Sequence, residues 1–408
     1  MVRRVRIANS GFLWSSASTI LVGVLGLVCL IVAARGLGPS EYVDFAVVWG
    51  VFFGLGGVFA GMQQEITRCI TRSSQSGQVP LIRPTLLLSA PVAVVGALAT
   101  QWSGGAASPI SALAMAVGLL GLGGLTHLNG SLASSSRWWA VTAVLLVEAM
   151  VRTAVLFVVV LSDSRAGIVV AVVIGAITWP ILLLGRTWRS AFTISVPVRL
   201  GGFMARAGGS MAAAGCGALL LAGFPLVAQV VRNDLGGPRV GAALAGLTLI
   251  RSGLLMPVFG MRPLVLNRFM ADLGTPRSQG LWIFRAVLSC GGAYVLVVTM
   301  SGPWLLQGVL TDGFRLDRPT CAILAVGSTG VMTLVLCGLA LLARGRHAVA
   351  ALGWATALMT TAVLLAVPDA AKDAVVLSAS LAPWVGVLVH AVAWSPRHAT
   401  ATVRVTSS

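Results

Sequence analysis

The chain has 408 residues, of which 57% are hydrophobic and only 10% are charged, and its mean hydropathy is +0.94. So few charges cannot cover the surface of a water-soluble protein of this size. The net charge of +17 raises the question of nucleic-acid binding, but the arginines are spread between apolar segments along the whole chain, so no nucleic-acid partner is expected.

Apolar stretches of about 20 residues follow one another from end to end, and this is the length that a helix needs to cross a bilayer. We therefore predict an all-α integral membrane protein with about twelve transmembrane helices in two six-helix lobes. The predicted spans are Phe12–Ala34, Tyr42–Gly61, Pro84–Thr100, Ile110–Leu128, Trp138–Leu161, Gly167–Leu184, Ala207–Val231, Gly241–Val258, Ile283–Met300, Pro319–Ala343, Val349–Val367 and Ala374–Trp394.

The distribution of basic residues predicts the orientation. If the N-terminus is cytoplasmic, 19 of the 28 lysines and arginines fall in inner segments and 7 in outer ones, while Arg152 and Arg251 lie within spans. Positive charge is enriched on the cytoplasmic side of membrane proteins. Both termini are therefore predicted to be cytoplasmic. One lysine against 27 arginines suggests a GC-rich, bacterial coding genome, so the expected location is a bacterial inner membrane, as a multi-pass protein.

One of the longest segments between spans, Gly185–Arg206, divides the spans six and six. It mixes aromatic and aliphatic residues with arginines, which favours an amphipathic connector along the membrane interface over a solvated loop. The predicted organisation is an N-terminal lobe (1–185), a connector (186–206), a C-terminal lobe (207–396) and a cytoplasmic tail (397–408).

Charges inside spans are costly, so each is a candidate functional residue. Glu148 and Arg152 are four residues apart, which predicts an ion pair on one helix face. The pair is either structural or presents Arg152 to a substrate phosphate. Arg251 has no acid one turn away, and its guanidinium matches the geometry of a phosphate. We count Arg251, Arg152 and Glu148 as candidate substrate-binding residues.

His127 in the fourth span and Glu65 near the inner end of the second are candidates for a proton relay. The alternative is a histidine bonded to a neighbouring helix and a glutamate at the membrane interface. The six cysteines are scattered, and most fall inside spans, as is typical of packing residues. We predict no metal site, no cofactor, no catalytic residues and no enzyme.

Two motifs carry a resemblance to a known family. Ala33-Ala34-Arg35-Gly36-Leu37-Gly38-Pro39-Ser40-Glu41-Tyr42 joins the first two spans, and Gln64-Glu65-Ile66-Thr67-Arg68 closes the second. This region resembles the polysaccharide-synthesis (Wzx-like) flippases of the multidrug/oligosaccharidyl-lipid/polysaccharide exporter superfamily, which tend to have a Leu-Gly-Pro turn and an arginine closing span two. Leu244-Ala245-Gly246-Leu247-Thr248-Leu249-Ile250-Arg251 looks like the eighth helix of that family. Val43 replaces a usual glycine, and Ser252-Gly253 replaces a proline-containing step.

The resemblance implies two six-helix lobes around a central cavity that opens alternately to either side. It implies export or flipping of a polyprenyl-pyrophosphate-linked glycan or a related lipid-linked precursor. Arg35, within the first motif, joins the candidate substrate-binding residues. The expected partners are the lipid bilayer, this glycan lipid and other membrane proteins of glycan assembly.

Two other functions stay open at this stage. A cation-coupled multidrug exporter of the same superfamily would use a carboxylate in the first helix, but the first predicted span contains none. A membrane glycan polymerase or transferase usually carries a large outer loop with catalytic charges, whereas the predicted outer loops are short. The sequence therefore favours the flippase over both.

Overall fold

The computed structural model describes residues 2–72, 79–102, 108–162, 164, 167–196, 199–232, 234–271, 276–367 and 369–393. Helices make up most of this part of the chain, and its two strands are two residues long each. The predicted all-α fold is confirmed. The predicted tail (397–408) and Trp394, the last residue of the twelfth predicted span, lie outside the described residues.

Ten helices within the described ranges are long and apolar enough to cross a membrane. One of them, Ser16–Thr71, has 56 residues, which is enough for two crossings of about 20 residues each. A shorter apolar stretch, Gly167–Leu182, occupies the place of the sixth predicted span. The predicted spans therefore fall on helical segments, while the side of the membrane on which the termini lie stays a prediction.

The first helix, α1 (Val2–Gly56), contains the first predicted span and most of the second, joined through a kink. Gly38 has φ 74° at the kink, a left-handed conformation that glycine adopts without steric cost. Pro39 follows, and it lacks the amide hydrogen that would continue the helical bonding. A turn at Gly57 and Val58 separates α1 from α2 (Phe59–Arg72), so the helix runs on past Gly61, where the second predicted span ends.

Two of the predicted spans are broken helices. The sixth consists of α6, a 3₁₀ turn and α7, and the seventh consists of α9 and α10. Pro180 and Pro225 lie in the first turn of α7 and α10, the position that proline favours because its missing amide hydrogen has no partner there. The helices of this region are α3 (Ile82–Trp102), α4 (Pro109–Ser134), α5 (Trp138–Leu161), α6 (Gly167–Val173), α7 (Trp179–Leu182), α8 (Arg186–Phe192), α9 (Leu200–Leu221) and α10 (Phe224–Val231).

The predicted connector contains a short helix that packs on the bundle. Trp188 and Phe192 of α8 pack against a core cluster of α4 and α5 that includes Leu132 and Val141. Strand β2 (Ser195–Val196) then pairs antiparallel with β1 (Val79–Pro80). The next helix, α9, begins at Leu200, within the predicted connector. The apolar side chains of α8 are thus partly covered by protein, and the position of the connector along the membrane interface stays a prediction.

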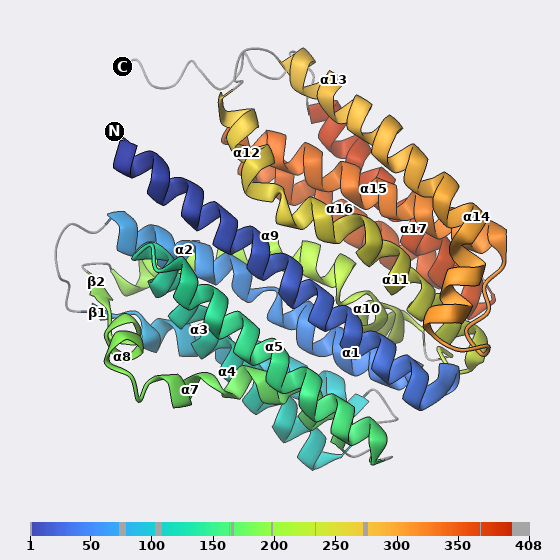
Figure 1. The fold of residues 1–408 in the computed structure, drawn as a ribbon, viewed down its shortest axis with the longest axis horizontal. Helices are drawn as coiled ribbons and strands as arrows, with labels where there is room; N and C mark the ends of the chain where they lie inside the picture. Colours follow the sequence, from blue (N-terminus) through green and yellow to red (C-terminus); the bar gives the residue numbers. More distant parts are fainter. Residues whose placement is uncertain are drawn as a thin grey trace. The chain divides into compact units, whose positions relative to one another are not determined.

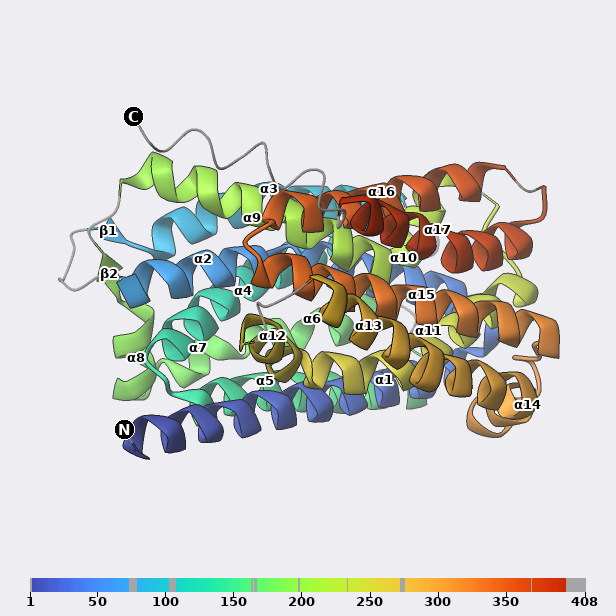
Figure 2. The same ribbon diagram turned by 90° about the horizontal axis from the view of Figure 1, so that it is seen from above.

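The remaining helices are α11 (Pro238–Gly260), α12 (Arg262–Ala271), α13 (Pro276–Ala286), α14 (Gly292–Val309), α15 (Arg318–Ala343), α16 (His347–Ala366) and α17 (Ala371–Ala393), with a π-helical turn at Val287–Gly291. Among the last three, α17 packs against both α15 and α16 (Figure 2). In the N-terminal region, α5 runs alongside α1 (Figure 1).

The described residues form two compact units. The first comprises the described residues up to Ala245 together with 306–315, and the second comprises the described residues of 246–305 and those from Leu316 onward. Helices α9 and α10 therefore belong to the same compact unit as α1 to α8. The predicted division into lobes at 186–206 stays a prediction.

Candidate functional site

Glycines line the face of α1 and α2 that meets α9 and α10. They are Gly50, Gly54, Gly57 and Gly61, and we call this contact the glycine seam. A methyl group on Gly54 would stand 2.5 Å from the Cα atom of Gly223, and one on Gly61 would overlap the backbone of Ser210. Small residues allow helix backbones to approach closely within a membrane. The seam therefore fixes how near α9 and α10 lie to α1 and α2.

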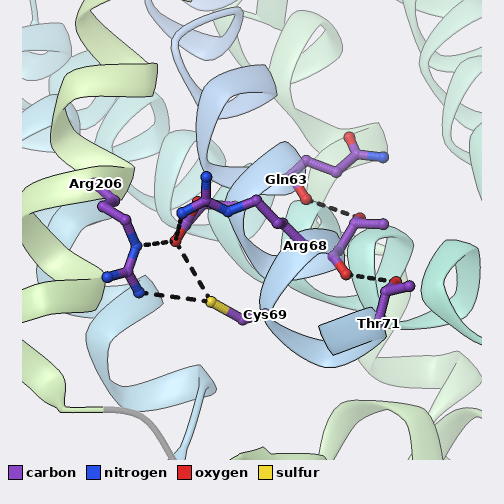
Figure 3. Close-up of polar contacts among 7 residues, drawn as sticks. Gln63, Arg68, Cys69, Thr71 and Arg206 are labelled. Carbon is purple, nitrogen blue, oxygen red and sulfur yellow. Dashed lines mark hydrogen bonds and ion pairs between the residues drawn. The ribbon is translucent and has the colours of Figure 1, made fainter. Parts of the chain in front are cut away.

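The seam continues to a buried carboxylate one helical turn beyond Gly61. Glu65 is 3% exposed, and its Oε1 accepts a hydrogen bond of 2.6 Å from Nε of Arg206 on α9. Its Oε2 lies 3.0 Å from Nε of Arg68 on α2 itself, and the thiol of Cys69 donates to Oε1 at 3.4 Å. Figure 3 shows Arg206 and Arg68 reaching toward the same place beside Cys69. We call these four residues the Glu65 cluster.

The Glu65 cluster combines a buried carboxylate with two accessible arginine side chains. The side chains of Arg68 and Arg206 are 45% and 46% exposed, whereas Glu65 is almost completely covered. Two guanidiniums face one carboxylate, so the cluster has a formal surplus of one positive charge. Its ion pair between Glu65 and Arg206 joins α2 to α9, and the surplus charge attracts anions rather than cations.

The second buried carboxylate is paired within its own helix. Glu148 and Arg152 form the ion pair predicted from their spacing on α5, and they are 5% and 3% exposed. The Arg152 guanidinium also lies over two rings of α1, 4.6 Å from the centroid of Phe53 and 5.9 Å from that of Trp49. Such cation–π contacts are strongest where the cation is removed from water. Nε of Arg152 is buried without a hydrogen-bond partner among the described residues.

Arg251 lies in the second unit, on α11, and is 5% exposed. One of its guanidinium nitrogens donates to the carbonyl of Ala379 on α17 at 3.4 Å, which is long for a hydrogen bond. The neighbouring carbonyl of Ile250 accepts from the hydroxyl of Tyr294 on α14. The arginine is therefore held among α11, α14 and α17 in the interior of that unit.

Arg35 is placed beside the end of another helix. Its Nε donates to the carbonyls of Val309 and Leu310 at 2.8 and 3.1 Å, and Nη2 donates to that of Gly308 at 2.9 Å. These carbonyls end α14, where a cation is favoured by the helix dipole and by the unsatisfied acceptors. Arg35 thus has a structural role in this arrangement, and substrate binding would require these bonds to be exchanged.

The two proton-relay candidates are not joined to each other. His127 is fully buried on α4, and its Nε2 lies 2.9 Å from the carbonyl of Phe192, the last residue of α8. Its ring also packs edge-on against the ring of Phe192. Within the described residues, no hydrogen bond links His127 to Glu65. This arrangement matches the alternative reading of His127 as a residue bonded to a neighbouring helix, and a proton-carrying role for either residue stays a prediction.

Comparison with known proteins gives relatives over nearly the whole chain. No family model matches the sequence. The uncharacterized protein Rv1510 of Mycobacterium tuberculosis is 29% identical over 394 residues, which are 93% of this chain and 90% of that protein. The uncharacterized protein Mb3654 of Mycobacterium bovis is 27% identical over 400 residues, covering 95% of this chain and 92% of that protein.

Solved structures identify the fold. An inward-facing multidrug resistance MATE family transporter of the MOP superfamily superposes with a TM-score of 0.68 at 14% identity, over 93% of this chain and 96% of that one. The lipid II flippase MurJ superposes with a TM-score of 0.69 at 11% identity, over 93% and 87%. The chain has the fold of MATE transporters and MurJ. A third protein of this fold, a MOP superfamily transporter from Pyrococcus furiosus, matches with a TM-score of 0.61 at 13% identity, over 94% and 95%.

Within this MATE-like fold, the contact that sequence reasoning missed is the one between Glu65 and Arg206. Their positions are 141 residues apart, and the sequence marks Arg206 only as one of the inner basic residues. One signal was present in the sequence. Gly54, Gly57, Gly61 and Glu65 recur at helical spacing, which indicates a face that meets another helix closely and ends in a buried acid that needs a basic partner.

Proposed function

We propose that the protein moves a lipid-linked oligosaccharide or polysaccharide precursor across the bacterial inner membrane by alternating access, without catalysing a covalent step. The fold shared with a lipid II flippase and with MATE transporters supports a transporter. Because the identities are 11% and 14%, the choice of substrate rests on the chemistry of this chain's own residues.

The observation that carries the proposal is the balance of buried charge. Among the described residues, the buried carboxylates are Glu65 and Glu148, and each is ion-paired with an arginine. Arg251 and Arg152 are buried as well. With the half-exposed Arg68 and Arg206 that face Glu65, four guanidiniums accompany these two carboxylates. A phosphate or pyrophosphate group of a glycan lipid is the complementary charge, and guanidinium binds it in a two-pronged geometry.

The same balance disfavours the alternative of a cation-coupled multidrug exporter. A sodium ion or a cationic drug needs a carboxylate that is not already neutralised. Both buried carboxylates are neutralised by arginine, and the first predicted span has no acid. The other alternative, a glycan polymerase or transferase, is disfavoured mainly because the predicted outer loops are short. Both would be revealed by the experiment described below.

Arg251 is the first candidate for the phosphate contact. Its bond to the Ala379 carbonyl is long, at 3.4 Å, whereas a phosphate would offer two parallel bonds to oxygens that carry the opposite charge. Arg152 would have to leave Glu148, and Arg35 would have to leave three carbonyls. We place Arg251 first among the three because its bond to the Ala379 carbonyl is longer than the contacts that hold Arg152 and Arg35.

The test uses a strain that lacks this protein. A membrane-impermeant label reports on which side of the membrane the lipid-linked glycan lies. We expect the precursor to accumulate on the cytoplasmic side, and wild-type protein to restore its transfer. Arg251→Ala should abolish the restoration, and Arg251→Lys should restore it partly because lysine keeps the charge but loses the fork. Membrane abundance of each variant is the control for insertion and folding.

Three results would contradict the proposal. Unchanged orientation of glycan lipids together with altered drug sensitivity would support the exporter. Loss of glycan chain length without a change in orientation would support the polymerase. A stable Arg251→Ala protein that transfers the precursor normally would remove Arg251 from the mechanism, and the phosphate contact would pass to Arg152 or Arg35.

A further inference from the structure

A pocket of about 260 Å³ lies between α12 and α13 in the second unit. It is lined by Arg268 and Phe269 from α12 and by Ser278, Gln279, Leu281, Trp282 and Arg285 from α13. Among the described residues that line it, the polar groups are two guanidiniums, a hydroxyl, an amide and an indole N–H, and none is a carboxylate. The pocket is therefore built for an anion.

The walls of this α12–α13 pocket are fixed by contacts between the two helices. Nε2 of Gln279 donates to the carbonyl of Phe269 at 2.9 Å. The rings of Phe269 and Trp282 meet edge to face at 5.5 Å, and the Arg268 guanidinium lies 5.7 Å from the centroid of the Trp282 ring. The aromatic contact holds Arg268 at the pocket while its charge stays accessible. The second arginine, Arg285, is exposed as well.

Large apolar side chains on α12 and α13 are exposed beside the pocket. Leu264, Leu281 and Phe284 are 51%, 48% and 62% exposed, and Leu288 follows one turn later at 67%. In a membrane protein such side chains face acyl chains. The helical stretch that contains α13, Ser278–Val309, is also apolar enough to cross a membrane, whereas α12 is not among the spanning candidates. The pocket thus lies at the first residues of a candidate span, where lipid headgroups are expected to meet acyl chains.

We propose that the α12–α13 pocket binds the phosphate of an anionic phospholipid of the surrounding bilayer. Arg268 and Arg285 would bind the phosphate oxygens, and Leu281, Phe284 and Leu288 would contact the acyl chains. Basic pockets at the ends of spans on the cytoplasmic side bind anionic headgroups, and the arginine distribution predicts that side for this segment. The apolar flank distinguishes this ligand from soluble phosphate. The inference does not rest on the proposed transport function.

The test is native mass spectrometry of the full-length protein titrated with phosphatidylglycerol or with phosphatidylcholine of the same acyl chains. We expect wild type to retain phosphatidylglycerol on the order of tenfold better, since each basic residue near a membrane surface contributes measurably to binding an anionic lipid. The double variant Arg268→Gln/Arg285→Gln should bind the two lipids equally. The matched control Arg186→Gln/Arg189→Gln removes the same charge from exposed arginines of α8 and should keep the preference.

A double variant that keeps the preference would overturn the proposal. Displacement of phosphatidylglycerol by millimolar inorganic phosphate would overturn it in favour of a site for soluble phosphate. Displacement by a stoichiometric amount of polyprenyl pyrophosphate would overturn it as well and would assign the pocket to the transported lipid. Misfolding is excluded by the melting temperature and by Arg268→Lys/Arg285→Lys, which keeps both charges and should retain a reduced preference.

Discussion

The two buried carboxylates of the first unit are neutralised in different ways. Glu148 is paired with Arg152 one turn along the same helix, so the pair moves with α5 as one body. Glu65 is paired with Arg206 of α9, a helix that comes 141 residues later in the chain. A displacement of α9 against α2 leaves the first pair intact and must break the second. The first pair therefore stabilises one helix, and the second is a contact that opens when α9 moves away from α2.

Solvent exposure points to the same difference. Both members of the α5 pair are almost fully buried, whereas Arg206 and Arg68 are nearly half exposed around the buried Glu65. Breaking the α5 pair would leave a charge without compensation inside the bundle. Breaking the bond between Glu65 and Arg206 leaves Arg206 exposed at the protein surface and leaves Glu65 paired with Arg68 of its own helix. The energetic cost of opening is thus much lower at Glu65.

The largest effect is expected for Glu148→Gln, which leaves the Arg152 guanidinium buried without its counter-charge. Removing one partner of a buried ion pair costs about 3–5 kcal/mol. We expect a large fall in the melting temperature of the purified protein. The double variant Glu148→Gln/Arg152→Gln should recover much of the loss, because no charge remains to be neutralised. A single variant as stable as the double variant would show that the α5 pair is not the stabilising contact described here.

An intermediate effect is expected in the glycine seam. Gly61→Ala places a methyl group on the backbone of Ser210, and overpacking of this kind costs about 1–3 kcal/mol. The matched control is Gly209→Ala on α9, where an added methyl group meets nothing within 4 Å. The control should be neutral or stabilising by up to about 1 kcal/mol because alanine favours the helix. Equal melting temperatures for the two variants would contradict the close approach of α2 and α9.

The smallest effect is expected at an exposed ion pair. Asp234 accepts two hydrogen bonds of 2.7 Å from Arg232, and these bonds lower the pKa of the Asp234 carboxyl below its ordinary value of 3.8. Asp234→Asn should cost less than about 1 kcal/mol, because Asp234 is 57% exposed. Since the folded-state pKa is the lower one, the contribution is present above pH 3.8 and is lost as the pH falls through the folded value. Melting curves of both proteins at neutral and acidic pH would check this, and a variant deficit that grows toward acid would contradict it.

The local parts of this account could be predicted from the sequence, and the long-range parts could not. Apolar runs located the helices because a span has a fixed length, and the spacing of Glu148 and Arg152 gave their ion pair because both lie on one helix. The breaks before Pro180 and Pro225 were missed because apolar composition continues across them. The partner of Glu65 required knowledge of which helices are neighbours, which spacing within one helix does not contain.

The central claim is that the ion pair between Glu65 and Arg206 holds α2 against α9 and that the α5 pair does not. The most direct measurement is double electron–electron resonance between spin labels at the exposed positions Thr71 on α2 and Ala205 on α9, in protein whose native cysteines have been replaced. We predict that Glu65→Gln enlarges a population with a longer distance, while a folded Glu148→Gln protein keeps the wild-type distribution. Identical distributions for wild type and Glu65→Gln would contradict the claim.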